Sequence, residues 1–460
     1  MTAGGLLTHW QLAPTVRIGR DQAGVLHLIG SGQSGPLPLG GQSDELADTL
    51  RNLKAGAVTA ADPLELGGLT GDQLHAAGWL DALVGCPQAP LFSRQALPTG
   101  RPAKAADLDG PLALSPLAVL HPAHGQLALE SATAASRLLL PAGSPVLALL
   151  GALAAPRTPA ELAELVPMLP AATVDAVLDR LVADGFVAPA TSSGEAGSGE
   201  AGSGEAGWSA HEAWFHARSR WGGHAATDYI GPVDGPAASP VREPYPGDPI
   251  RLHRPEPGSL AGADRTLAEV MQARRSVRGH DEANPLRLDQ LAEFLYRTAA
   301  IRETFDYQGA SYTRRPYPAG GTGYELELYL AAGTVHGLPV GLYHYDPAEH
   351  ALRTVAGAEP AGQLLERARI TALSPNRPQS LLVIAARFDR MLGRYRGMGY
   401  ATVLKDVGVL YQSMYLVATA MGLAPCALGN GDSAGFAAAT GTDFLSETSV
   451  GEFLLGSRPS

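Results

Sequence analysis

The sequence predicts a chain of two parts: a winged-helix-like N-terminal region, then a domain in which helices flank a central sheet. Three observations predict this fold class. A repeat of Gly, Ser, Glu and Ala over residues 192–207 divides the chain, a helix–turn–helix–strand pattern precedes it, and a buried strand with a long apolar helix follows it. At roughly 100 to 200 residues per domain, 460 residues leave room for two or three domains.

The repeat SSGEAGSGEAGSGEAG contains no side chain that a core could bury, so we expect a flexible, self-repelling linker. Four parts follow from this division. They are a small N-terminal unit over residues 1–110, which can be a second winged helix, a winged-helix-like peptide-docking domain over 111–190, the linker over 191–207, and a C-terminal domain over 208–460 in which we expect the chemistry.

The winged-helix pattern begins where Thr158 and Glu161 form a capping box at the start of a short helix. In the next segment, AATVDAVLDRLVADGFV, apolar residues recur at helical spacing, and Gly185 is placed to end that helix before an extended piece. Three aspartates against one arginine on its exposed face would repel phosphate, so we favour docking of a protein or peptide over DNA. These residues are Asp175, Asp179, Asp184 and Arg180.

Composition excludes several other classes of function. A formal net charge of -11 gives no field that would draw the chain to nucleic acid or to an anionic membrane. The N-terminus lacks the features of a signal peptide, and the most apolar window, residues 138–156, is interrupted by proline and glycine, so we expect a cytoplasmic protein that does not enter the membrane.

No metal site is expected. Cys86 and Cys426 are the only cysteines, too few for a disulfide framework or a four-cysteine zinc site. The sequence HEAWFH is one residue longer than the zinc-protease motif, which would place His211 and His216 about 140° apart around a helix.

After the linker, the expected elements follow in a fixed order. A helix from Leu267 ends in the arginine cluster of MQARRSVRGH, a second helix covers residues 288–300, and the glycine-rich loop RPYPAGGTGY leads into the alternating strand ELELYL. A strand and turn, GLYHYDP, is followed by a central strand at 381–388 that is apolar on both faces and by a buried helix at 406–421 that Gly422 ends.

The arginine cluster indicates a local anion site in an acidic chain. Arginine forks suit phosphate, and Ser276 adds a hydroxyl donor to the same oxygens. The alternative is a solvated helix terminus. The glycine-rich loop would let backbone amides approach a flat ligand closely.

Together ARRSVRGH, RPYPAGGTGYELELYL, GLYHYDP, LKDVGVLYQSMYLVATAMGLAPCALG and VGEFLLGSR resemble the FMN-dependent nitroreductase family, and within it the SagB-type azoline dehydrogenases. The resemblance covers about residues 210–460. It implies an α+β nitroreductase-like fold, a homodimer with FMN at the interface, and an N-terminal region similar in outline to peptide-recognition winged helices.

The resemblance also implies which residues bind FMN. The phosphate, ribityl chain and ring edge would contact the arginine–serine–arginine motif, joined at the phosphate by an arginine near the C-terminus. The ring would lie at the glycine loop, which has alanine where many members have serine, and at a segment whose backbone faces flavin N5. These residues are Arg274, Arg275, Ser276, Arg278 and Arg458, then Pro318, Ala319, Gly320 and Gly321, and finally Leu428, Gly429 and Asn430.

The implied reaction is oxidation of a peptide thiazoline or oxazoline to a thiazole or oxazole, as in ribosomal peptide natural product biosynthesis. A base removes the proton on the ring carbon derived from Cα while hydride leaves the neighbouring carbon for the flavin. The implied partners are an azoline-containing precursor peptide and a separate cyclodehydratase, since no zinc-ligand set or nucleotide loop suggests that this chain makes the azoline itself.

The catalytic pair departs from the family pattern. A family Lys-Tyr pair appears here as Arg394-Tyr395, followed by Tyr400, and Lys405 lies too far along to replace the lysine. Because arginine stays protonated, it cannot be the base, so Tyr395 is the leading acid–base candidate, with its ionised form favoured by Arg394. The alternative is that Tyr395 only packs in a ring pocket.

Two other functions remain open. A general NAD(P)H-dependent nitro or quinone reductase would share the FMN motifs, and rapid flavin reduction by NAD(P)H would favour it. A non-catalytic scaffold that holds a peptide would lack bound yellow flavin.

Overall fold

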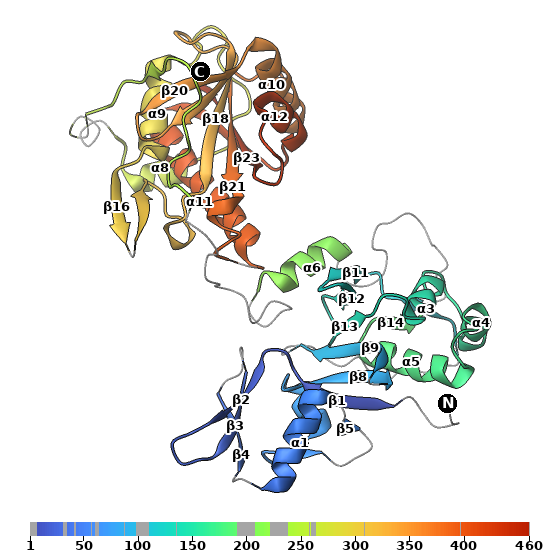
Figure 1. The fold of residues 1–460 in the computed structure, drawn as a ribbon. Coiled ribbons are helices and arrows are strands. Elements are labelled where there is room, and N and C mark those ends of the chain that lie inside the picture. The colour runs from blue at the N-terminus through green and yellow to red at the C-terminus, as the bar shows by residue number, and fades with distance from the viewer. Residues whose placement is uncertain are drawn as a thin grey trace. The chain divides into compact units, whose positions relative to one another are not determined.

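The structure is a computed structural model that describes residues 7–30, 35–40, 43–56, 58–59, 64–86, 88–97, 110–134, 136–190, 208–220, 238–256, 258, 264–307, 309–395 and 397–459. The chain divides into two compact units, Met1–Tyr229 and Ile230–Ser460 (Figure 1). The predicted linker at residues 191–207 lies outside the described residues.

The first unit is built on a 7-stranded antiparallel sheet in the order β11-β12-β13-β9-β8-β1-β5. Its strands come from both sides of residue 110, where the sequence placed a domain boundary, because β9 pairs with β13. The elements before residue 110 are β1 (Thr8–Leu12), β2 (Val16–Arg20), β3 (Leu26–Gly30), β4 (Leu37–Gly40), α1 (Asp44–Ala55), β5 (Val58–Thr59), β6 (Glu65–Leu66), β7 (Leu69–Thr70), α2 (Gly71–Ala76), β8 (Leu80–Cys86) and β9 (Ala89–Ala96).

The predicted helices of the winged-helix pattern are present. Helix α4 starts at the Thr158–Glu161 capping box with Pro159 at its first position, and α5 ends before Gly185, whose φ is 83°. The remaining elements of this unit are β10 (Leu112–Leu114), β11 (Ala118–Ala123), β12 (Gln126–Ser131), β13 (Ser136–Leu140), α3 (Val146–Ala152), α4 (Pro159–Leu165), α5 (Ala171–Ala183), β14 (Val187–Pro189) and α6 (Ala210–Arg218).

One aspartate of the predicted exposed face is in fact buried. Asp184 is 1% exposed and accepts two hydrogen bonds from Arg94 of β9. Arg180 is partly buried and donates to the Thr8 hydroxyl on β1. Asp175 and Asp179 are exposed as expected. The sequence could not show that the sheet covers one end of α5, because Arg94 lies 90 residues away in the chain.

The second unit has a 7-stranded sheet in the order β15-β20-β19-β18-β21-β23-β22, with antiparallel pairs throughout. Its strands are β15 (Ile250–Arg251), β18 (Leu326–Ala332), β19 (Gly341–Asp346), β20 (Ala351–Ala356), β21 (Ser380–Arg387), β22 (Leu423–Leu428) and β23 (Glu447–Ser457). The predicted central strand is β21, whose apolar residues are buried on both faces as a strand between two others requires.

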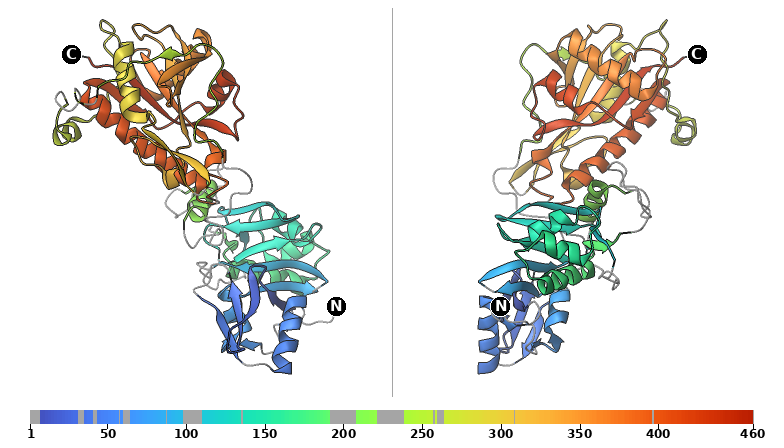
Figure 2. Two further views of the ribbon diagram at one scale, coloured as in Figure 1. Left: turned by 60° about the vertical axis from the view of Figure 1, so that its left-hand side comes forward. Right: turned by 90° about the vertical axis from the view of Figure 1, so that its right-hand side faces the viewer.

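Helices cover both faces of this sheet. Helices α9 and α11 pack over the face that carries Leu328 and Phe453, with α8 packed against α11, while α10 and α12 cover the face that carries Tyr329 and Leu454 (Figures 1 and 2). The helices are α8 (Leu267–Ala273), α9 (Leu288–Ala299), α10 (Ala358–Ala372), α11 (Gly399–Ala420) and α12 (Ser433–Thr440), with short 3-10 turns η1 (Gly320–Thr322) and η2 (Phe388–Arg390) and a hairpin of β16 (Glu303–Tyr307) and β17 (Ala310–Arg314).

Two expectations for this unit need correction. Helix α11 begins at Gly399, seven residues before the predicted start at Asp406, because Ala401, Thr402 and Val403 already pack inward. Strand β18 is buried along its whole length although its sequence alternates, since helices lie on both sides, and Glu327 is buried against His344. Among the described residues, no helix is both long enough and apolar enough to cross a bilayer.

Candidate functional site

The arginine cluster lies beside α11 and β22. Helix α8 ends at Ala273, and the extended segment that follows is fixed by a hydrogen bond from the Val277 amide to the Pro425 oxygen, at 2.8 Å. The Ser276 hydroxyl lies 2.7 Å from the Tyr415 hydroxyl, and the Arg274 guanidinium lies over the Tyr415 ring, 5.3 Å from its centroid. Tyr415 therefore joins this segment to α11.

Two guanidiniums of this segment face solvent. Arg275 and Arg278 are exposed, and no carboxylate within the described part of the chain pairs with either of them. Guanidinium groups with this exposure are able to pair with an anion from solution.

Arg458 lies next to the same segment. It directly follows Ser457, which accepts a backbone hydrogen bond from Asp281 at 3.2 Å and donates from its hydroxyl to the Asp281 oxygen at 3.1 Å. The pairing of β23 with β22 brings Ser457 opposite Leu423. Arg458 therefore directly follows a residue that contacts Asp281, three positions after Arg278.

The glycine loop requires glycine at two positions. A methyl group at Gly320 would overlap the Thr402 side chain, and one at Gly321 would overlap the Tyr395 hydroxyl. Gly321 also has a φ of 55°, which favours glycine. The loop is therefore enclosed by α11 and by the segment before it, and Ala319 is partly buried while Pro318 is exposed.

Arg394 and Tyr395 lie directly on this loop. The Arg394 guanidinium donates to the Gly321 oxygen at 2.9 Å and lies 5.6 Å from the centroid of the Tyr395 ring. Both side chains are partly buried. Tyr400 is placed differently: it lies on the first turn of α11, is exposed, and has its ring centroid 6.0 Å from that of Phe388.

Two buried carboxyl groups lie beneath the glycine loop, and the sequence analysis did not identify either. Asp406 accepts hydrogen bonds from the Gly320 amide at 3.1 and 2.9 Å on its two oxygens. Glu325 is 0% exposed, and burial together with the neighbouring Asp406 charge raises its pKa to about 8. Burial also raises the pKa of Asp406. The only sequence signal was a pair of acidic residues within otherwise apolar segments.

The segment at residues 428–430 ends β22 and leads into α12. Leu428 is buried and its oxygen lies 3.5 Å from the Tyr411 hydroxyl, while Gly429 and Asn430 are exposed. Behind them, Glu452 accepts from the Asp432 amide at 3.0 Å, and burial raises the pKa of Glu452 to about 7. A buried carboxyl group therefore supports this segment as well.

The three segments are distributed along α11. Asp406 contacts the glycine loop, Tyr411 approaches Leu428, and Tyr415 contacts the arginine segment. At about 1.5 Å per residue, the first and last of these lie roughly 13 Å apart along the helix. The arrangement suits an elongated ligand with a flat part at the glycines and an anionic end at the arginines.

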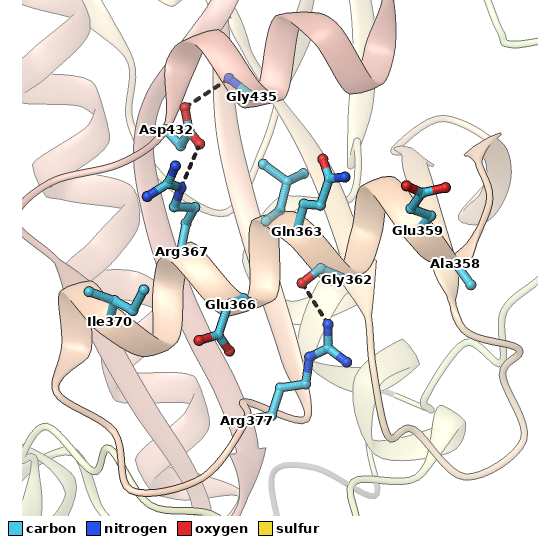
Figure 3. A pocket seen from close by; sticks show the side chains of 11 residues that line it. Ala358, Glu359, Gly362, Gln363, Glu366, Arg367, Ile370, Arg377, Asp432 and Gly435 are labelled. Atoms are coloured by element: carbon cyan, nitrogen blue, oxygen red, sulfur yellow. Dashed lines mark hydrogen bonds and ion pairs between the residues drawn. The ribbon is translucent and has the colours of Figure 1, made fainter.

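A surface pocket of about 810 Å³ lies elsewhere, on α10 and the start of α12 (Figure 3). Its arginines are already engaged: Arg367 lies 3.6 Å from Asp432, and Arg377 donates to the Gly362 oxygen at 2.6 Å. It contains none of the predicted site residues.

Comparison with family models gives two matches. Residues 271–456 match the nitroreductase family, and residues 112–225 match the family described as cyanobactin oxidase ThcOx. The first match spans the arginine segment, the glycine loop, α11 and most of β23. The second spans the winged-helix pattern and α6.

Three relatives show where the similarity lies. The Methanocaldococcus jannaschii protein MJ1384, described as a nitroreductase, is 27% identical over 40% of this chain and 85% of its own length. The trifolitoxin-processing protein TfxB of Rhizobium leguminosarum is 29% identical over 32% of this chain and 41% of its own. The microcin B17-processing protein McbC of Escherichia coli is 32% identical over 24% of this chain and 42% of its own. The chain thus spans about two fifths of the length of these last two proteins.

Proposed function

Residues 271–456 are a nitroreductase-family domain, and from this premise we propose that the chain is an FMN-dependent dehydrogenase that oxidises peptide thiazolines or oxazolines to thiazoles or oxazoles. The observation that carries the proposal is the combination, in one chain, of this domain with a region that matches a cyanobactin oxidase family. Similarity to two proteins named for the processing of peptide toxins supports the same reaction class.

The residues present fit FMN. Arg275, Arg278 and Arg458 supply cationic forks for its phosphate, and Ser276 supplies a hydroxyl donor. At Gly320 and Gly321 the absence of a side chain lets the loop pack directly against Thr402 and Tyr395, and it leaves the loop backbone able to approach a flat ring closely. When bound, the flavin supplies an acceptor for hydride.

The chain's own residues handle the proton. In the proposed reaction the azoline loses a proton from the carbon derived from Cα and a hydride from the neighbouring ring carbon. Tyr395 is the base in this proposal, because its hydroxyl lies on Gly321 of the loop that would hold the ring. Arg394 holds the loop through the Gly321 oxygen, and its guanidinium carbon lies 5.6 Å from the centroid of the Tyr395 ring.

The proposal extends to partners. The winged-helix-like region with exposed Asp175 and Asp179 would dock the precursor peptide, whose azolines a separate cyclodehydratase makes. We propose a cytoplasmic homodimer as the working form, which the family resemblance implies.

The test is mass spectrometry of a thiazoline-bearing peptide incubated aerobically with purified, flavin-loaded protein. We expect the loss of two hydrogens per ring, and we expect Tyr395→Phe to slow the loss by at least a hundredfold, the scale of general-base catalysis. Tyr307→Phe, which alters an exposed tyrosine on β16, is the matched control. An unchanged peptide mass with bound FMN would overturn the proposed reaction.

A general nitro or quinone reductase is the second candidate, favoured by the match to MJ1384 over 85% of that protein. Anaerobic mixing with NADPH or NADH distinguishes the two. Flavin bleaching within seconds would support the reductase, whereas slow bleaching together with azoline oxidation would support the dehydrogenase.

A further inference from the structure

Asp406 holds the glycine loop from below. It is 6% exposed, and both of its carboxylate oxygens accept from the Gly320 amide. Thr402, one helical turn earlier on α11, fills the space under the same glycine. The loop is therefore fixed to α11 through one residue whose hydrogen bond depends on its charge.

Glu325 lies beside Asp406. Its carboxyl oxygens make no hydrogen bond of good geometry with the described residues, and their nearest polar neighbours are the Asp406 carboxyl group and the amide of Glu325 itself. A methyl group at Gly323 would contact it at 3.4 Å, so Glu325 lies under the same loop. Two buried carboxyl groups side by side cannot both ionise at low cost, and the raised pKa of Glu325, about 8, reflects this.

Three cationic groups lie near the pair, and Glu327, a further buried carboxyl group, also lies near Arg315. Arg315 is buried and donates to the Leu326 oxygen, Arg390 donates to the Gly323 oxygen at 3.0 and 2.6 Å, and Lys405 precedes Asp406 on α11. Arg315 and Lys405 each favour ionisation of the nearer carboxyl group, but burial opposes it more strongly. At neutral pH Glu325 therefore keeps its proton, while the hydrogen bonds from the Gly320 amide favour the ionised form of Asp406.

We propose that Asp406 is a positioning residue for the Gly320–Gly321 loop at the flavin ring, and that a single proton shared with Glu325 keeps it in place. This inference rests on the proposed function, because the loop meets a flavin only in that proposal. It assigns to the acidic pair a role separate from that of Tyr395, which lies on the outer side of Gly321.

Loss of the shared proton should loosen the loop. When Glu325 ionises, two adjacent anions repel each other beneath Gly320, and the carboxylate of Asp406 is displaced from the amide that it accepts. We assume that flavin binds only when Glu325 is protonated. One pH unit above the pKa of Glu325, about one molecule in eleven is still protonated. The apparent dissociation constant for FMN at pH 9 is therefore about tenfold higher than at pH 7.

The first experiment titrates flavin-free protein with FMN at pH 7, 8 and 9 and follows the quenching of flavin fluorescence. We expect affinity to fall about tenfold in the parent and less than twofold in Glu325→Gln, which cannot place a second charge in the pair. Asp289→Asn, an exposed carboxylate paired with Arg287, should behave like the parent. Equal pH dependence in parent and Glu325→Gln, or none in the parent, would overturn the inference.

The second experiment needs no flavin. Amide hydrogen exchange of residues 316–326 at pH 7 should be about tenfold faster in Asp406→Asn than in the parent, as expected for the loss of one charge-assisted hydrogen bond. Thermal melting of the variant confirms that it folds. Unchanged exchange in folded protein would exclude positioning by Asp406. Absence of FMN binding at every pH would instead count against the proposed function, and this exchange result would still decide the role of Asp406.

Discussion

Arg94 on β9 and Asp184 at the end of α5 form a two-pronged ion pair, with Nε to Oδ2 at 2.8 Å and Nη2 to Oδ1 at 2.6 Å. The pair fastens the helical part of the first unit to its sheet. Because the Asp184 side chain is buried, it cannot repel or attract a binding partner. The electrostatic argument against DNA binding therefore depends on the exposed Asp175 and Asp179.

Replacing Arg94 by methionine should destabilise the first unit strongly. The change leaves the buried Asp184 carboxylate without its partner, and breaking such a pair costs about 3 kcal/mol in the free energy of unfolding. Urea denaturation followed by circular dichroism measures the loss. Asp179→Asn on the exposed face should change stability by less than about 0.5 kcal/mol. Equal stability of Arg94→Met and the parent would mean that the pair contributes nothing net.

The substitution Glu130→Gln should weaken the contact between α6 and the rest of the first unit. The buried Glu130 accepts from Trp214 Nε1 at 3.2 Å and lies 3.4 Å from Arg218 Nη1, and both of these residues belong to α6. Loss of the charge should speed amide exchange of α6 by roughly tenfold or more. Glu164→Gln, on the exposed face of α4, is the control. Unaltered exchange in α6 would show that ring packing alone holds the helix.

The free energy of unfolding of the first unit should depend on pH because of Asp81. Burial raises the pKa of Asp81 to about 7, so the folded state keeps a proton that the unfolded chain releases above about 4. The contribution of Asp81 to the free energy of unfolding is fully present below about pH 4 and is lost as the pH rises to about 7. The total loss is on the order of 4 kcal/mol. The pKa of His75 is lowered to about 4, mainly by burial, which acts in the opposite direction. The parent therefore has to be compared with Asp81→Asn between pH 4 and 8, and a pH-independent difference would contradict the prediction.

Alanine at Gly321 should abolish tight FMN binding, because its methyl group overlaps the Tyr395 hydroxyl and the φ of 55° disfavours any side chain. Adding Tyr395→Phe removes the overlapping oxygen and should restore part of the affinity. Fluorescence titration of the two single variants and the double variant completes a mutant cycle. Strict additivity would mean that the two residues do not touch in the working protein.

Glutamine at Arg275 should weaken FMN but not riboflavin, which lacks the phosphate. We expect about a tenfold loss for FMN, the scale of one charge-assisted hydrogen bond. Arg314→Gln, an exposed arginine already paired with Glu303, should alter neither affinity. An equal loss for both flavins would place Arg275 at the ring or ribityl chain instead.

Periodicity predicted three helices of the second unit, α8, α9 and α11, and its central strand, because this signal is local. Helices α10 and α12 were not predicted. The seven earlier residues of α11 were missed since they carry no cap and no regular apolar stripe. Contacts between residues far apart in the chain could not be predicted either. The pairing of β9 with β13 across residue 110 and the burial of Asp184 depend on residues far apart in the chain.

The candidate site also has one part that the sequence indicated and one part that it did not. The arginine segment and glycine loop stand out by composition, and the structure brings Arg394 and Tyr395 onto the loop. Asp406 and Glu325 carried no motif, and only their burial beneath Gly320 marks them. Tyr400 had the right residue type, but its place on the first helical turn turns its ring toward Phe388.

Helix α11 also fixes the distance between the glycine loop and the arginine segment. Asp406 and Tyr415 lie nine positions apart in one unbroken helix, and each is hydrogen-bonded to a different segment of the site. Deleting one residue between them would turn one contact by about 100° and shift it by about 1.5 Å relative to the other. The spacing between the glycine loop and the arginines is therefore set by the number of residues in the helix, and a one-residue deletion there would disturb both ends of the site.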